Sequence, residues 1–68
     1  MTYTDEKGRT YKVMPSIVKD GNLRYVTMFR QPHGMWFTKM PVMPWRKDAA
    51  TAQKDLDDMA KRKGWVAV

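Results

Sequence analysis

The stretch TYKVMPSIVKDGNLRYVTMFR (Thr10–Arg30) predicts a β-hairpin, and the rest of the fold is read outward from it. Asp20-Gly21 stands between two segments in which apolar and polar residues alternate. Asp-Gly is a strong signal for a tight turn, because a type I′ turn needs a positive φ at both central residues. We therefore expect strands over about residues 10–18 and 23–30, joined by a two-residue loop.

A third strand is expected after a second turn. The sequence QPHG at residues 31–34 combines a proline that fixes φ with a glycine that can adopt the left-handed conformation, and a strand over about residues 35–42 follows it. Pro15 interrupts the first strand and Pro41 the end of the third. Because proline has no N–H to donate to a ladder, both strands should be edges of a simple three-stranded meander.

The last third of the chain has a helical pattern. Asp48 is a good N-cap, apolar residues recur at spacings of three and four, and Gly64 can supply the left-handed residue that ends a helix. We expect a helix over about residues 49–63. Residues 65–68 form either a short fourth strand or an apolar flap. The expected fold class is α+β, a three-stranded antiparallel meander packed on one C-terminal helix.

The whole chain, 1–68, is expected to be a single small domain in which residues 1–9 form a loose N-terminal tail. A chain of 68 residues buries only about 60% of the surface that its unfolded form exposes, so its core must be small. A deep pocket lined by its own residues is therefore not expected.

The expected register divides the sheet into two faces. A two-residue loop pairs Ile17 with Arg24, and a three-residue loop over 32–34 pairs Arg30 with Trp36. The face expected to pack under the helix contains Tyr11, Val13, Ile17, Val26, Met28, Trp36, Met40 and Val42. The opposite, open face is expected to contain Lys12, Met14, Ser16, Val18, Leu23, Tyr25, Thr27, Phe29, Phe37 and Lys39.

Positive charge is concentrated in the first two thirds of the chain. The sequence carries 13 Lys and Arg against 7 Asp and Glu, a formal net charge of +6. Residues 1–47 hold nine of these bases and three acids, whereas residues 48–68 hold four of each. A localised basic field of this kind attracts polyanions and is expected of nucleic-acid binders.

The sequence contains few residues that could form a catalytic or a metal site. His33 is the only histidine and falls in an expected turn, Ser16 is the only serine, and cysteine is absent. Neither a metal-ligand spacing nor a glycine-rich phosphate loop occurs, so we expect no enzyme activity, no metal and no cofactor. The absence of cysteine, of a secretory leader pattern and of an apolar stretch near the roughly 20 residues of a membrane span predicts a cytoplasmic protein without membrane contact.

The meander backed by one helix, with GMWFTKM (Gly34–Met40) followed by AATAQKDL (Ala49–Leu56), resembles two families of small DNA-binding domains. These are the domains of plant ethylene-response factors and the N-terminal arm-binding domains of phage and transposon integrases. The resemblance covers roughly residues 10–63 and implies that the open sheet face docks in the major groove. The residues that match this role are Lys12, Tyr25, Thr27, Phe29, Phe37 and Lys39.

One departure from those families concerns arginine, because their recognition strands are richer in it. Arg24 and Arg30 are expected at the rims of the helix-facing side, and we include both as further nucleic-acid-binding candidates.

Two classes of function follow. The favoured one is a nucleic-acid-binding module whose partner is DNA or RNA, and the compact, Met-rich chain suggests a phage or mobile-element origin. The alternative is a protein-binding module, such as a phage-encoded inhibitor that meets an acidic surface of a host protein, or a homodimer formed through the open sheet face. Its anchors would be Tyr25, Phe29, Trp36 or Phe37.

Overall fold

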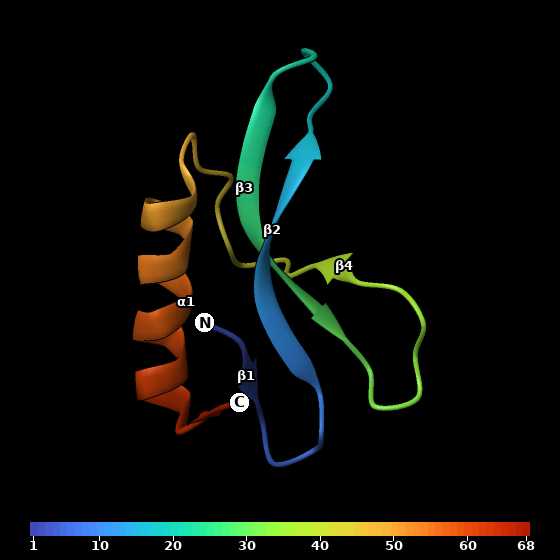
Figure 1. Cartoon of the computed structure of the whole chain (residues 1–68), viewed down its shortest axis with the longest axis vertical. Coiled ribbons are helices and arrows are strands. Elements are labelled where there is room, and N and C mark those ends of the chain that lie inside the picture. The colour runs from blue at the N-terminus through green and yellow to red at the C-terminus, as the bar shows by residue number, and fades with distance from the viewer.

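The computed structural model describes all residues 1–68 and has the expected α+β architecture, with one five-stranded antiparallel sheet and one helix (Figure 1). The strand order is β4-β3-β2-β1-β5, so the sheet has two strands more than predicted. The elements are β1 (Tyr3–Thr4), β2 (Thr10–Ile17), β3 (Leu23–Arg30), β4 (Thr38–Lys39), α1 (Ala49–Lys63) and β5 (Val66–Ala67).

The β2–β3 hairpin forms as predicted, but its loop has three residues instead of two. Val18 donates its N–H to the Asn22 carbonyl at 3.0 Å, and Gly21 donates to the Val18 carbonyl at 2.9 Å. Gly21 has a φ of 83°, and no residue other than glycine has a positive φ. A type I turn followed by a left-handed glycine needs only one positive φ. The predicted type I′ turn would also force Asp20 into the left-handed region.

The extra loop residue shifts the register by one, so the predicted face assignment is wrong for β3. Val13 pairs with Thr27 rather than with Met28, and a shift of one residue moves every side chain of a strand to the other face. One face, here called the basic face, contains Thr10, Lys12, Met14, Ser16, Arg24, Val26, Met28, Arg30 and Lys39, together with Phe37, whose ring contacts two of them. The other, the helix-side face, contains Tyr11, Val13, Pro15, Ile17, Leu23, Tyr25, Thr27, Phe29 and Thr38.

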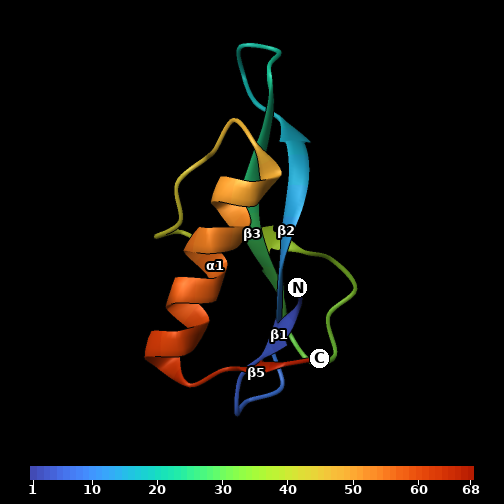
Figure 2. The same cartoon turned by 60° about the vertical axis from the view of Figure 1, so that its left-hand side comes forward.

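Aromatic contacts identify the face on which α1 packs. Tyr3 lies opposite Tyr11 in the sheet, and the Tyr3 hydroxyl donates to the Asp57 carboxylate of α1 at 2.7 Å. The Tyr11 ring stacks on Trp65, just beyond the helix, with the ring centroids 3.8 Å apart. Figures 1 and 2 show α1 along one side of the strongly twisted hairpin, and the chain has no second helix for the other side. The basic face therefore lies mostly away from α1; its exception is Val26, which is buried in a cluster with Met43 and the helix residue Met59.

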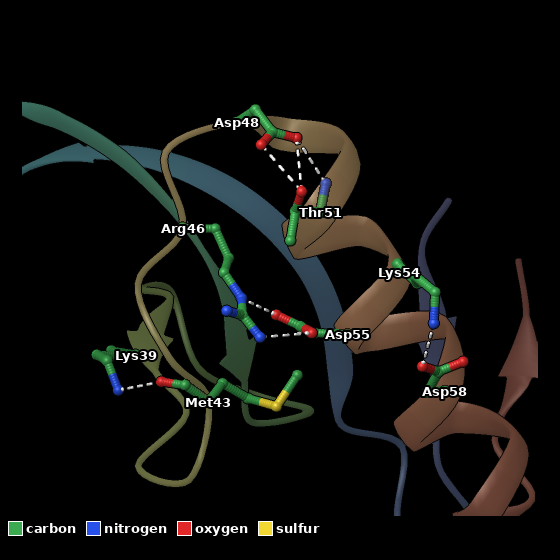
Figure 3. Close-up of polar contacts among 8 residues, drawn as sticks. All are labelled: Lys39, Met43, Arg46, Asp48, Thr51, Lys54, Asp55 and Asp58. Carbon is green, nitrogen blue, oxygen red and sulfur yellow. Dashed lines mark hydrogen bonds and ion pairs between the residues drawn. The ribbon is translucent and has the colours of Figure 1, made fainter.

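Helix α1 begins and ends at the predicted residues. The Asp48 side chain accepts a hydrogen bond from the Thr51 N–H at 2.8 Å, as an N-cap does (Figure 3). Gly64 has a φ of 75°, and Trp65 donates its N–H to the Ala60 carbonyl at 2.9 Å, which closes the C-terminus. The buried helix residues are Ala52, Leu56, Met59 and Ala60.

The core includes a cluster of Val26, Met43 and Met59. The segment from Met40 to Arg46 closes this core along the outer edge of β3, because Met40 donates to the Thr27 carbonyl and Arg46 exchanges two hydrogen bonds with Tyr25. This segment takes the place of the C-terminal half of the third strand that the sequence predicts.

Three residues predicted as core are instead exposed. Trp36 is 80% exposed, Val42 71% and Ile17 65%. Because β4 spans only two residues, Trp36 lies outside the sheet, in the β3–β4 loop, and Val42 falls in the segment after β4. Ile17 is the last residue of β2, beside the hairpin loop.

The prediction of a loose N-terminal tail is wrong. Strand β1 pairs with β2 and also with β5, which settles the alternatives for the C-terminus in favour of a strand. The turn between β1 and β2 is organised by Asp5, whose carboxylate accepts hydrogen bonds from the Tyr11 hydroxyl and the Arg9 guanidinium, both at 2.8 Å. It also accepts the backbone N–H groups of Lys7 and Arg9.

These contacts change the acidity of both Asp5 and Tyr11. Burial disfavours the charged form of Asp5, but the hydrogen bonds from Tyr11 and Arg9 outweigh burial and lower its pKa to about 2. Burial, together with the hydrogen bond to Asp5, raises the pKa of Tyr11 to about 12.

Strand β2 is an edge strand over the part that contains Pro15, but not at its start. Strand β1 covers β2 only at Thr10 and Tyr11, so the rest of its outer edge has no strand beside it. Tyr25 directs its backbone groups outward to Arg46, and its partner Pro15 must therefore also direct its backbone nitrogen away from β3. The missing N–H of Pro15 costs no ladder bond.

Candidate nucleic-acid interface

The basic face combines four cationic side chains with no acidic one. Lys12, Arg24, Arg30 and Lys39 come from three neighbouring strands. The acidic residues all lie in turns or in and before the helix, at Asp5, Glu6, Asp20, Asp48, Asp55, Asp57 and Asp58. The three ion pairs of the protein, Arg9–Asp5, Arg46–Asp55 and Lys54–Asp58, involve none of the four face cations. None of the four is therefore held in a salt bridge, although Arg24 lines the same hollow as Asp20 of the hairpin loop.

Phe37 gathers two of these cations on its ring. The Lys12 ammonium lies 4.6 Å from the ring centroid and the Arg30 guanidinium carbon 5.2 Å from it. Each such contact is worth about 0.5–1 kcal/mol at an exposed site, which helps to hold two like charges close together. The Nε atom of Arg30 is buried and has no hydrogen-bond partner. The face therefore presents a preassembled pair of cations at its β4 end.

Lys39 has a structural role that the sequence does not reveal. Its ammonium donates to the carbonyl oxygens of Met40, at 3.1 Å, and Met43, at 2.7 Å, and Figure 3 shows the second of these contacts. It also lies 5.8 Å from the centroid of the Trp45 ring. Because an ammonium has three donors, two of which are used here, Lys39 can offer one hydrogen bond to a ligand.

Arg24 and Trp45 extend the face toward the hairpin loop. Both line a hollow of about 630 Å³ together with residues 16–20. The Arg24 guanidinium makes one hydrogen bond, to the Leu23 carbonyl at 2.9 Å. Arg24 and Arg30 lie six residues apart on β3, so the cationic track along this strand is roughly 20 Å long at about 3.3 Å per residue.

Three of the predicted site residues do not lie on the basic face with the others. Tyr25, Thr27 and Phe29 belong to the helix-side face, where Thr27 is buried and Phe29 packs against Tyr11 with the ring centroids 6.1 Å apart. The predicted cluster of open-face aromatics therefore does not exist. The structure brings together Lys12, Arg24, Arg30, Phe37 and Lys39 from the predicted set.

Sequence reasoning assigned Trp36 to the core face and did not single out Met35 or Trp45 as site residues, and all three side chains are exposed in loops. Met35 and Trp36 are 82% and 80% exposed in the β3–β4 loop, and Trp45 is 39% exposed after β4. The turn at Gln31–Gly34 is correct, since Gly34 donates its N–H to the Gln31 carbonyl at 2.9 Å, but the loop continues to Phe37. The exposure of Met35 and Trp36 was not predicted, because a strand expected to start at Met35 includes both residues in its alternating pattern.

Comparison with known proteins adds no relative. No family model, no curated protein and no solved structure matches this chain. The one helix is too short and too polar to cross a membrane, and no group of three or more acidic or histidine side chains is placed to hold a metal ion.

Proposed function

We propose that the protein binds DNA or RNA through its basic face, with Lys12, Arg24 and Arg30 as the phosphate contacts. One observation carries the proposal: the hairpin register brings these cations onto one face of the sheet, where no strand residue is acidic and none of the cations forms a salt bridge. Each phosphate neutralised by such a side chain releases condensed counterions, which is the main source of affinity in non-specific binding.

The arrangement of the arginines supports the resemblance to the sheet-based DNA-binding domains. The expected register separated Arg24 and Arg30 from Lys12, whereas in the structure all three share one face with Phe37. The two-residue β4 is a departure, because the third strand of this sheet is much shorter than expected. Phosphate contact is therefore better supported than base reading in the major groove.

The test is a salt titration of binding to labelled DNA and RNA oligonucleotides, followed by fluorescence anisotropy. Between about 50 and 200 mM salt we expect a linear fall of log K with log salt concentration. Lys12→Ala and Arg24→Ala should each reduce the slope by roughly one unit, as expected for the loss of one phosphate contact. Lys61→Ala is the matched control, because Lys61 is exposed on α1 and makes no ion pair.

Two results would contradict the proposal. One is an equal loss of affinity in Lys12→Ala and Lys61→Ala, which would indicate diffuse attraction to a cationic chain. The other is an absence of wild-type binding to DNA and RNA at about 100 mM salt.

The exposed apolar side chains favour a second candidate, a protein-binding module. Met35, Trp36 and Val42 are each more than 70% exposed and could anchor a protein contact beside the basic face. Binding to an acidic protein surface through such anchors should depend much less on salt than phosphate binding does. The homodimer variant is tested by sedimentation equilibrium of the purified protein, which should then show a dimer.

A further inference from the structure

The β3–β4 loop presents a tryptophan that the fold itself does not use. Trp36 is 80% exposed, although tryptophan is among the side chains that gain most from burial. In Figure 1 this loop, in yellow-green, extends on the side of the hairpin away from α1. Its last residue before β4 is Phe37, which carries the Lys12 and Arg30 side chains on its ring.

Phe37 and Trp36 differ in what their rings can still bind. The Phe37 ring is already occupied by two cations of the protein, whereas no aromatic or cationic partner contacts the Trp36 indole. Consecutive Cα atoms are about 3.8 Å apart, so the residue that bears the free indole is the direct neighbour of Phe37, whose ring contacts the two cations. An exposed aromatic surface beside fixed positive charges matches the base and the adjoining phosphates of one nucleic-acid strand.

We propose that Trp36 stacks on an unpaired base, so that the basic face binds single-stranded nucleic acid in preference to duplex. This inference rests on the proposed function. In a duplex each base is already stacked between its neighbours and shows only its edges, whereas an unpaired base exposes a π-face to an aromatic side chain. Lys12 and Arg30 hold the phosphates beside the stacked base, and this contact does not depend on the base sequence.

The experiment compares one labelled single-stranded oligonucleotide with the duplex formed from it and its complement, at equal salt. Trp36→Ala should weaken binding to the single strand about tenfold or more and binding to the duplex much less, since a stacked base contributes that much to affinity. Trp36→Phe should restore much of the loss. Because no phosphate contact is removed, the salt slope of Trp36→Ala should equal that of the wild type, unlike that of Lys12→Ala.

The matched control is Val68→Ala, which truncates another exposed apolar side chain, beyond β5 at the last residue. It should leave both affinities unchanged. Quenching of tryptophan fluorescence by the single strand is a second readout, and it should be smaller in Trp36→Phe, in which only Trp45 and Trp65 remain to be quenched.

The outcomes separate the inference from the proposed function. The role of Trp36 is overturned if the wild type binds single strand and duplex with equal affinity, or if Trp36→Ala has no effect on binding to the single strand. In either case, a reduced salt slope in Lys12→Ala would still support the nucleic-acid face. If the wild type binds neither oligonucleotide, the proposed function fails. Circular dichroism should show that Trp36→Ala is folded, because the side chain it removes is exposed.

Discussion

Replacing Asp5 by asparagine tests the turn that attaches β1 to the hairpin. The carboxylate accepts four hydrogen bonds, among them one from the Tyr11 hydroxyl and one from the Arg9 guanidinium, and its side chain is only 5% exposed. Its pKa falls from an ordinary 3.8 to about 2 in the folded protein. One pKa unit corresponds to about 1.4 kcal/mol, so ionisation of Asp5 favours the folded state by roughly 2 kcal/mol at neutral pH.

The sign of the pH dependence follows from the lowered pKa. The stabilisation by Asp5 is fully present above the pKa of the unfolded chain, near 4, and is lost as the pH falls toward 2. Asp5→Asn should therefore unfold more easily than the wild type at pH 7, by roughly 2 kcal/mol. The difference between the two proteins should shrink as the pH falls from about 5 to about 2.

Urea denaturation followed by circular dichroism at a series of pH values measures this difference. Glu6→Gln is the matched control, because Glu6 is the next residue, is exposed and makes no hydrogen bond or ion pair through its side chain. Equal unfolding free energies of Asp5→Asn and Glu6→Gln at pH 7 would show that the Asp5 carboxylate does not hold this turn.

Three further predictions concern stability. Gly64→Val should lower the free energy of unfolding by about 1 kcal/mol, because a β-branched residue is strained at a φ of 75° even though no atom lies within 4 Å of the added Cβ. An unchanged melting temperature would argue against the left-handed cap. Trp36→Ala should change the unfolding free energy by less than about 0.5 kcal/mol, and a variant that unfolds would place Trp36 in the core. Lys39→Ala should lower the free energy of unfolding, measured by urea denaturation, by about 1–2 kcal/mol, because it removes the hydrogen bonds to the Met40 and Met43 carbonyls. Lys12→Ala loses only a cation–π contact and should lower it by less than about 1 kcal/mol.

The basic face was only partly predictable, because the face on which each side chain of β3 lies depends on one turn. Asp20-Gly21 correctly indicates a hairpin, but the same residues fit a two-residue and a three-residue loop, and the two loops place Arg24 on opposite faces. A two-residue loop would place Tyr25, Thr27 and Phe29 on the face of Lys12, whereas the three-residue loop places them on the helix-side face. Lys12 kept its predicted face because β2 precedes the loop.

The sequence alone determined the elements that depend on neighbouring residues. The bounds of α1 follow from the Asp48 cap and Gly64, whose effects act within one helical turn, and the existence of the hairpin follows from its alternating strands and turn residues.

The tertiary structure decided whatever depends on distant partners. It paired β1 with β2 and β5. It also limited the third strand to Thr38–Lys39, because Arg46 bonds to Tyr25 farther along the same edge, and this leaves Trp36 outside the sheet. These outcomes require long-range hydrogen bonds between segments that local propensity treats as independent. The set of side chains that share the basic face is therefore a property of the assembled sheet and not of any single strand.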